Sequence, residues 1–476
     1  MTKWLFESEI SDLKIIFRDT GPILMAFGAL TGFPALASLF YREFTGALVF
    51  LFTGALYIGL GFFFSAMVSE EKTGSAKHAQ LSIALVWLIA VFLGGVPFLR
   101  IHPPLDALFE SAAGFTTTGF TLMEDALEVE KGILLWRSLQ PFMGGVFFVT
   151  SVLALSKSFD ANSDRGLKER METISLKVLK LYGLFLVAGF LLFLLSGTTV
   201  FEALGYSLSS ISTGGFSVNG SLGALGLNNS RAVIVSLLLT VLGSMNILLI
   251  FKVLEGDLNE VLKNAEILGG ILLVAAGTLA AAFAKGDFFI ELYHFFAALT
   301  TSGFMIVDTP ALAGSEGFYK AFLTAIMLIG GSIYSTAGGL KIYRVVVLVK
   351  SLYWRMLALL PDKTTVARKI HNIEDFLLSD ENLIRVYSFA GFFILAFTAS
   401  GLVVSAYGYP VLDAFFESAS ALSNVGLTTG IVSPAMPQPL KLLFIFDMLL
   451  GRLEVLGLMV LIFYITGKMK VVTIGR

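Results

Sequence analysis

The chain has no cysteine among its 476 residues, which excludes disulfide bonds, thiolate zinc sites and iron–sulfur clusters. Its four histidines are scattered, and no two of them have the spacing of metal ligands. Charged residues make up only 14%, and the net charge of −2 offers no basic face to a nucleic acid. Hydrophobic residues make up 56%, which leaves too little polar surface for a soluble protein of this size, so we expect a membrane protein.

The apolar residues gather in long runs, and a run of about 20 can cross ~30 Å of hydrocarbon as a helix. The longest polar interval, roughly 350–384, is too short to bury a core of its own, so no separate soluble domain is expected. Ten runs qualify as spans, near residues 21–41, 45–68, 81–99, 132–156, 178–199, 231–254, 267–285, 318–349, 385–407 and 438–466.

The distribution of lysine and arginine predicts how the spans are oriented. With the N-terminus inside, most of the 33 basic residues fall in cytoplasmic segments, as such residues do in membrane proteins. The first twenty residues are acidic rather than basic and do not resemble a cleaved signal. We therefore expect a multi-pass protein of the cell (inner) membrane with both termini cytoplasmic.

The last eight spans form four pairs, and a short apolar segment too small for an ordinary loop separates the members of each pair on the outside. Aligned without gaps, these segments are internal repeats that share one glycine. The segments are Asp106–Thr121, Glu202–Ser217, Ile290–Met305 and Asp413–Thr428, and the shared glycines are Gly119, Gly215, Gly303 and Gly426. The predicted units are an N-terminal two-helix extension (1–79) and repeats 1 to 4 (80–177, 178–264, 265–383 and 384–476).

Each segment is predicted to enter from the outside as a short helix. Ten helical residues rise only ~15 Å, so the helix reaches about mid-membrane, where its negative C-terminal end favours a cation. Acidic residues begin the segments and could cap the helices or concentrate cations at the outer mouth. These residues are Asp106, Glu202, Glu291 and Asp413, while Glu110 and Glu417 lie inside the helices and are candidates for packing between repeats or for tuning the site.

The glycine regions are candidates for a selectivity filter. Non-helical backbone at that depth must line a cavity or be buried in protein, and glycine permits the left-handed dihedrals that turn successive carbonyls inward. Four such stretches around one axis would form a ring of carbonyl oxygens that replaces the hydration shell of a potassium ion. The candidate filter residues are Thr117, Thr118, Gly119, Phe120, Thr213, Gly214, Gly215, Phe216, Thr301, Ser302, Gly303, Phe304, Asn424, Val425, Gly426 and Leu427.

Other functions are less well supported by the sequence. Small residues also occur in loops and at helix contacts, but four segments in register argue against that reading. A voltage-gated channel would need arginine at every third position of one helix, and no such array occurs. A carrier with inverted repeats would place its segments on opposite sides. No nucleophile–base pair gathers at one membrane face, so no enzyme is expected.

Together with two further signatures, the four repeats resemble the Trk/Ktr/HKT superfamily of potassium transporters over nearly the whole chain. The signatures are residues 330–341 (GGSIYSTAGGLK) and residues 451–454 (GRLE), and the two extra spans resemble the TrkH type rather than the shorter KtrB type. The resemblance implies an all-α integral membrane fold of four parallel helix–pore loop–helix repeats around a pseudo-fourfold pore, preceded by two extra transmembrane helices. It also implies potassium uptake.

The resemblance further implies partners and a degree of ion choice. Relatives are homodimers that dock a cytosolic TrkA/KtrA-type nucleotide-binding regulatory subunit, here on the basic regions Lys157–Lys180 and Lys341–Arg385, which could otherwise face membrane lipid. Glycine at all four filter positions is similar to potassium-selective members, whereas serine in the first repeat marks sodium-conducting plant relatives. No organic cofactor is expected. The alternatives are a less selective potassium/sodium transporter and a cation-coupled symporter.

The two signatures supply candidate gate residues. Residues 330–339 hold four glycines and three hydroxyls, which weaken helix propensity, and the resemblance implies an intramembrane gate there, although a small-residue helix contact is the alternative. Arg452 is a costly charge near mid-membrane that would oppose a passing cation, unless it forms a structural ion pair with Asp447, Glu454 or another acid. The candidate gate residues are Gly330, Gly331, Ser335, Thr336, Gly338, Gly339 and Arg452.

Overall fold

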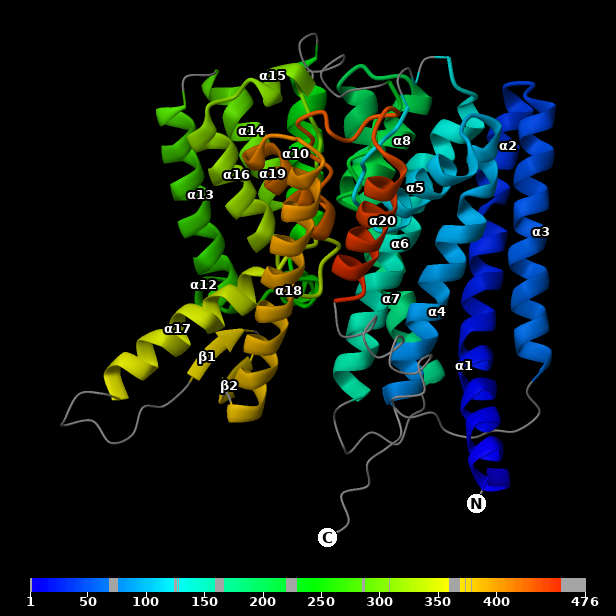
Figure 1. Ribbon diagram of the computed structural model, residues 1–476, viewed down its shortest axis with the longest axis horizontal. Coiled ribbons are helices and arrows are strands. Elements are labelled where there is room, and N and C mark those ends of the chain that lie inside the picture. Colours follow the sequence, from blue (N-terminus) through cyan, green and yellow to red (C-terminus); the bar gives the residue numbers. More distant parts are fainter. Residues whose placement is uncertain are drawn as a thin grey trace.

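The computed structural model describes residues 2–454 except 68–75, 124–125, 127, 159–166, 220–228, 285–286, 308, 359–368, 373 and 378. Its helices stand roughly side by side as one slab, as a multi-pass membrane protein requires (Figure 1). Seven helices are long and apolar enough to cross a membrane, and a bent pair makes an eighth candidate. The predicted all-α membrane fold is therefore confirmed, whereas the predicted unit boundaries stay a prediction.

The N-terminal extension lies at the right-hand edge of Figure 1 and consists of α1 (Thr2–Leu30), α2 (Gly32–Phe40) and α3 (Phe44–Ala66). Glycines let α1 and α3 approach closely, because a Cβ built on Gly21 or Gly61 would lie under 3.0 Å from the backbone of the opposite helix. Close contact through small residues is a usual way for helices to associate in a bilayer, where the hydrophobic effect between helices is absent.

The remaining helices group by the predicted repeats, although the first helices of repeats 1, 2 and 4 begin at residues 76, 167 and 380, before the predicted repeat starts at 80, 178 and 384. Repeat 1 holds α4 (Ala76–Gly94), η1 (Val96–Arg100), α5 (Pro104–Phe115) and α6 (Lys131–Ser158), and repeat 2 holds α7 (Leu167–Leu195), α8 (Val200–Ile211), α10 (Ser230–Ser244), α11 (Ile247–Leu254) and α12 (Leu258–Lys263). Repeat 3 holds α13 (Ala265–Phe283), α14 (Phe288–Leu299), α15 (Thr309–Ala313), α16 (Gly317–Ile329), α17 (Ile342–Ala358), β1 (Lys369–Asn372) and β2 (Glu374–Leu377), and repeat 4 holds α18 (Asp380–Ala406), α19 (Val411–Leu422) and α20 (Gln438–Arg452).

The four pore helices α5, α8, α14 and α19 share one length and one register. Each has 12 residues and ends four positions before its filter glycine. All four lie in the upper half of the molecule in Figure 1. At 1.5 Å per residue, 12 residues cover only about 18 Å, so each pore helix ends inside the membrane rather than crossing it.

Two predicted spans differ from the structure, and a third is interrupted where its glycine-rich composition predicts. The span predicted at 231–254 is the pair α10 and α11, which meet at an angle of 100° because Asn246 caps α11 by accepting the Leu248 N–H. The span predicted at 318–349 is interrupted between α16 and α17. The span predicted at 438–466 is helical to Arg452, and its residues from 455 lie outside the described part of the chain. The antiparallel hairpin of β1 and β2 is a further difference, since no strand was predicted.

Candidate functional site

The four filter segments share an unusual backbone conformation. The residue two positions before each glycine has φ between 52° and 59°, although none of these residues is glycine, and each shared glycine has φ between 63° and 98°. Bulky residues rarely adopt positive φ, and glycine does so without strain. The residues at the earlier position are Thr117, Thr213, Thr301 and Asn424. Because the same conformation recurs at equivalent positions of four different sequences, it is a structural feature of the site.

Main-chain N–H groups of the filter donate back to the pore helices. In repeat 1, the N–H groups of Thr118 and Gly119 donate to the Ala113 carbonyl at 2.9 and 3.1 Å. The other repeats make the same contact, from Gly214 to Ser209, from Ser302 to Ala297 and from Val425 to Ser420. Because the donors are satisfied within each repeat, the carbonyl oxygens on the opposite side of the peptide planes can face the axis.

The four glycines close into a ring. A Cβ built on any one of them would lie under 3.0 Å from the carbonyl oxygen that precedes the glycine of the next repeat. The contacts run in chain order, from Gly119 to Gly214, from Gly215 to Ser302, from Gly303 to Val425 and from Gly426 to Thr118. The structure thus brings the four shared glycines around one axis, with one carbonyl from each repeat beside them.

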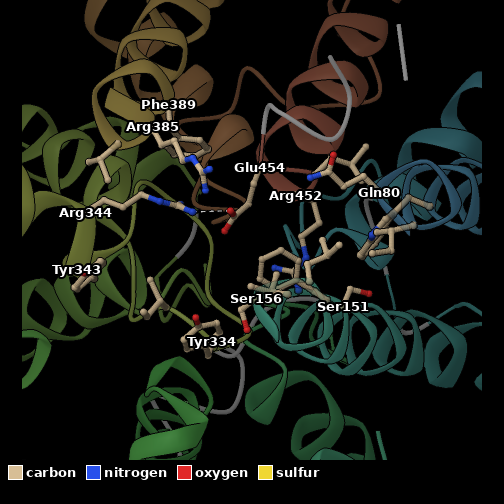
Figure 2. Close-up of a pocket in the computed structure, with 18 residues that line it drawn as sticks. Gln80, Ser151, Ser156, Tyr334, Tyr343, Arg344, Arg385, Phe389, Arg452 and Glu454 are labelled. Atoms are coloured by element: carbon tan, nitrogen blue, oxygen red, sulfur yellow. Dashed lines mark hydrogen bonds and ion pairs between the residues drawn. The ribbon is translucent and has the colours of Figure 1, made fainter. Parts of the chain in front are cut away.

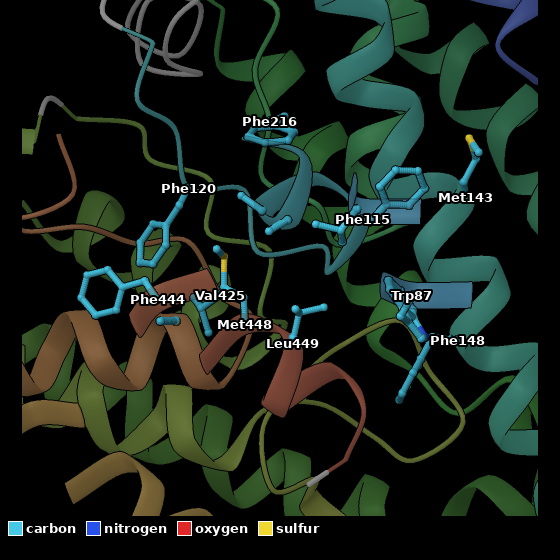
Figure 3. Packing of buried hydrophobic residues seen from close by; sticks show 14 of the residues in the cluster. Trp87, Phe115, Phe120, Met143, Phe148, Phe216, Val425, Phe444, Met448 and Leu449 are labelled. Atoms are coloured by element: carbon cyan, nitrogen blue, oxygen red, sulfur yellow. The ribbon is translucent and has the colours of Figure 1, made fainter. Parts of the chain in front are cut away.

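Aromatic residues that follow the glycines anchor this ring on the outside. Phe120 is 1% exposed, and its ring lies 6.1 Å from that of Phe444 on α20 of repeat 4 (Figure 3). Phe216 is equally buried and lies 4.3 Å from the guanidinium of Arg137 on α6 of repeat 1. The filter of one repeat therefore packs against the second span of the preceding repeat, which couples the four units mechanically.

Residues 330–341 form a loop between α16 and α17 that lies against the inner end of the filter segments. The N–H of Gly338 donates to the Thr301 hydroxyl at 2.8 Å, and the Thr213 hydroxyl lies 3.1 Å from that of Thr336. Thr336 also donates to the Gly243 carbonyl at 3.0 Å. The predicted interruption of this span is observed, and the loop is tied directly to two of the four filter segments.

The same loop contacts the other two repeats. A Cβ built on Gly338 would lie under 3.0 Å from the Ser423 carbonyl oxygen of repeat 4, and one built on Gly145 of repeat 1 would lie 3.0 Å from the Thr336 methyl group. Positive φ at Gly330 (71°) and Gly339 (77°) allows the chain to leave and rejoin the helices at its two ends. The loop is therefore in contact with all four repeats.

Arg452 holds this loop from the side of repeat 4. Its side chain is 1% exposed, and its Nη1 donates to the Thr336 carbonyl at 2.8 Å, while the Phe148 ring lies 4.1 Å from the guanidinium carbon. The predicted alternative partners are engaged elsewhere, since Asp447 accepts from Ser400 and Glu454 pairs with Arg344. Within the described residues no ion pair of Arg452 is found, and its Nε and Nη2 have no hydrogen-bond partner.

A cavity of about 580 Å³ opens beside the loop, on the side away from the filter (Figure 2). Trp87, Phe148 and Tyr334 give it largely apolar walls, and Arg452 lines it as well. Across the cavity, Arg344 on α17 and Glu454 form an ion pair at 2.6 Å. The second signature therefore contributes one residue that contacts the loop and another that fixes α17.

Two of the acidic residues at the pore-helix starts do not cap their helices as predicted. Asp106 and Asp413 make no cap, since Pro103 and Pro410 occupy the N-cap positions. They form ion pairs between repeats instead, with Lys441 of repeat 4 at 2.7 Å and with Lys320 of repeat 3 at 2.8 Å respectively. Both pairs are largely buried, so these carboxylates are neutralised in place rather than free to concentrate cations at the mouth.

The other two repeats differ at the same position. Glu202 completes a capping box with Thr199, because its carboxylate accepts the Thr199 N–H at 2.8 Å. In repeat 3 the cap is Asp287, and Glu291 lies one turn inside the helix, where its carbonyl accepts the Tyr319 hydroxyl. Capping by the predicted acid therefore occurs in one repeat of four.

Several residues that hold the site were not predicted. Arg137, Lys320 and Lys441 could have been found as charged residues within apolar spans. Glu266 at the start of α13 accepts from the Ile333 N–H of the loop at 2.7 Å and from the Asn246 side chain at 3.0 Å. Glu266 thus connects the loop to the break between α10 and α11, and no local sequence pattern predicts these two hydrogen bonds.

Comparison with known proteins relates this geometry to a family. The TrkH family of cation transport proteins matches residues 261–470. An uncharacterised cation transporter of Methanocaldococcus jannaschii is 30% identical, covering 94% of this chain and 95% of the relative. The Trk system potassium uptake protein TrkH of Salmonella typhimurium is 27% identical, covering 94% of this chain and 98% of its own length.

A solved structure has the same fold. The crystal structure of the potassium transporter TrkH from Vibrio parahaemolyticus matches with a TM-score of 0.83 at 23% identity, covering 94% of this chain and 98% of that chain. The agreement extends over nearly the full length, as the resemblance of the repeats predicts. This chain belongs to the TrkH family of cation transport proteins.

Proposed function

We propose that this protein takes up potassium ions across the cell membrane through one pore per chain. As a member of its family the chain is a transporter and not an enzyme. An ion entering from outside would exchange its hydration water for the main-chain oxygens of the four filter segments. The proposal is supported by relatives that are named potassium uptake proteins.

The observation that carries the proposal is the closed ring of glycines, each packed against a carbonyl of the next repeat. A ring of this kind supplies oxygen ligands from four directions, which suits a hard monovalent cation. The C-terminal ends of four pore helices point toward the same region and add a negative potential that favours a cation. A loop or a simple helix contact would not require the same positive φ at eight equivalent positions.

The loop 330–341 and Arg452 would form the gate of this pore. The loop spans the path beneath the filter, and Arg452 both holds it and adds a positive charge that opposes a passing cation. Opening would require the loop to leave its contacts with Thr213, Thr301 and Gly243. The loop is continuous with α17, so movement of that helix is a direct way to displace it.

A cytosolic partner would supply that movement. The relatives belong to Trk systems, and we propose that this chain works as a homodimer with a nucleotide-binding regulatory subunit of the TrkA/KtrA type. The basic residues Lys350 and Arg355 on α17 offer a cationic surface to such a partner or to anionic lipid. This arrangement requires both termini to face the cytoplasm of a cell whose inner membrane holds the protein.

Flux measurement in proteoliposomes tests the proposal. The purified protein should take up ⁸⁶Rb⁺, and external potassium should compete more strongly than sodium. Growth rescue of a potassium-uptake-deficient cell by the wild type but less by Gly119→Ser would connect the flux to the filter. If correctly folded protein takes up no cations, with or without a regulatory subunit, the proposal is refuted.

The second candidate is a less selective potassium/sodium transporter or a cation-coupled symporter. The five-residue segments around the shared glycines, here called the quintets, are residues 117–121, 213–217, 301–305 and 424–428. They differ between repeats, and only repeat 4 has valine before its glycine. An irregular ring discriminates less between ions of similar charge, because its oxygens are not equally constrained. Equal competition by sodium, or uptake that collapses when a proton or sodium gradient is removed, would favour this candidate.

A further inference from the structure

We propose that the residue nine positions before each filter glycine determines ion specificity. Its side chain forms a hydrogen bond, here called the hold, to the residue two positions after the glycine. That residue lies in the outgoing strand, by which we mean the extended segment that leaves the filter. We further propose that repeat 3 is the one in which this hold is missing. The four residues are Glu110, Tyr206, His294 and Glu417, which occupy equivalent places in the four pore helices. The inference rests on the proposed function of the quintets as a selectivity filter.

In repeats 1 and 4 the hold is a carboxylate. Glu110 accepts from the Thr121 hydroxyl at 2.7 Å and from the Leu122 N–H at 2.5 Å. Glu417 accepts from the Thr428 hydroxyl at 2.6 Å and from the Thr429 N–H at 2.8 Å. In both repeats the first contact joins residues eleven apart, and it is made two positions beyond the glycine. The outgoing strand is therefore fastened directly to its own pore helix.

In repeat 2 the same connection is a neutral hydrogen bond. The Tyr206 hydroxyl lies 3.1 Å from the hydroxyl of Ser217, which is again eleven residues later. Tyr206 is 0% exposed, as are the two glutamates. Each glutamate accepts from a hydroxyl and from a main-chain N–H, whereas Tyr206 forms a single bond between hydroxyls, so the hold in repeat 2 is weaker than in repeats 1 and 4.

Repeat 3 lacks the connection. The equivalent residues are His294, which is 1% exposed, and Met305, whose thioether offers no hydroxyl. In the part of the chain that the structure describes, His294 Nε2 has no hydrogen-bond partner. A buried polar nitrogen without a partner is uncommon, and His294 occupies the helix position from which the other three repeats reach a hydroxyl eleven residues later.

The physical consequence concerns how far the carbonyl ring can contract. Sodium is smaller than potassium, so the ring must close inward to coordinate it as well. A strand fastened beyond the glycine resists that movement, and an unfastened strand permits it. The four side chains are buried behind the filter and cannot touch the ion, so they act as positioning residues.

Charge and tethering can be separated in repeat 4. Thr428→Val removes one hydroxyl from the hold but keeps the Glu417 carboxyl group and its contacts with Thr429 and Ile431. Glu417→Gln keeps an acceptor oxygen but removes the ionisable group. If the hold determines specificity, Thr428→Val lowers the potassium-to-sodium uptake ratio by roughly two- to ten-fold, as expected for one lost hydrogen bond. If the charge alone matters, only Glu417→Gln changes the ratio, and the inference is overturned.

Repeat 3 allows the opposite experiment. Met305→Thr places a hydroxyl eleven residues after His294 and offers the unpartnered Nε2 a partner. We expect the potassium-to-sodium ratio to rise by roughly two- to ten-fold, while Met305→Val, which has nearly the same shape without the hydroxyl, leaves it lower. The ratio is measured from ⁸⁶Rb⁺ and ²²Na⁺ uptake into the same proteoliposomes, so variation in protein amount cancels.

One comparison separates failure of this inference from failure of the proposed function. If Gly119→Ser alters the ratio but neither Thr428→Val nor Met305→Thr does, the filter is real and the hold is not a determinant of specificity. If Gly119→Ser also leaves the ratio unchanged, the quintets are not the filter and the proposed function fails. A loss of uptake in Thr428→Val leaves the Met305→Thr and Met305→Val pair to decide the question.

Discussion

Gly338→Ala tests the loop more sharply than any other single substitution. A Cβ at this position would lie under 3.0 Å from the Ser423 carbonyl oxygen and 3.2 Å from the Asn424 Cβ, so the loop cannot keep its place against repeat 4. Overpacking of a tight site costs about 1–3 kcal/mol. Because the penalty applies only while the loop blocks the path, the ratio of open to closed pores should rise roughly 5- to 150-fold.

The assay is the initial rate of ⁸⁶Rb⁺ uptake into proteoliposomes at matched protein density. The increase in the uptake rate should approach about 150-fold if the wild-type pore is mostly closed. Gly391→Ala on α18 is the matched control, since nothing lies within 4 Å of a Cβ built there. An uptake rate equal to that of the wild type, with normal insertion and a normal elution profile, would show that the loop does not limit flux.

Three other substitutions address separate parts of the site. Gly119→Ser should reduce potassium-supported growth by about tenfold or more, because its side chain must displace the Gly214 carbonyl; unchanged growth would exclude the ring from conduction. Arg452→Gln should raise ⁸⁶Rb⁺ uptake at least about tenfold, since it removes a charged hydrogen bond to the loop, whereas complete loss of uptake would indicate a structural role. Asp106→Asn should destabilise the detergent-solubilised protein by about 3–5 kcal/mol, because the Lys441 ammonium is left buried without its counter-charge. A combined Asp106→Asn and Lys441→Met variant should recover much of the lost thermal stability. If it does not, the ion pair does not account for the lost stability.

Much of the architecture could be predicted from local patterns. The apolar runs indicated the all-helical membrane fold, and the constant spacing around Gly119, Gly215, Gly303 and Gly426 indicated four equivalent segments. That spacing has a simple cause, since each pore helix has 12 residues and the chain must turn four residues later. The glycine-rich composition of 330–339 likewise indicated where a span is interrupted.

Long-range partners could not be predicted in the same way. Asp106 pairs with Lys441, which lies 335 positions later in the sequence. The local capping rule instead predicted that Asp106 caps its own pore helix. The 100° bend at Asn246 was hidden because the flanking residues are apolar enough to form one span. The Asp106 contact therefore depends on the arrangement of the repeats. The bend rests on the local cap at Asn246, whose side chain also donates to Glu266 of repeat 3.

The loop between α16 and α17 occurs once, yet it contacts every quarter of the molecule. A tetramer of identical subunits would have to bring four copies of such a segment to the same small volume, where they would exclude one another. Joining the quarters in one polypeptide removes that constraint, because each can diverge alone. On the proposed gating, one loop, one arginine beside it and one adjoining helix would then be sufficient to control the pore.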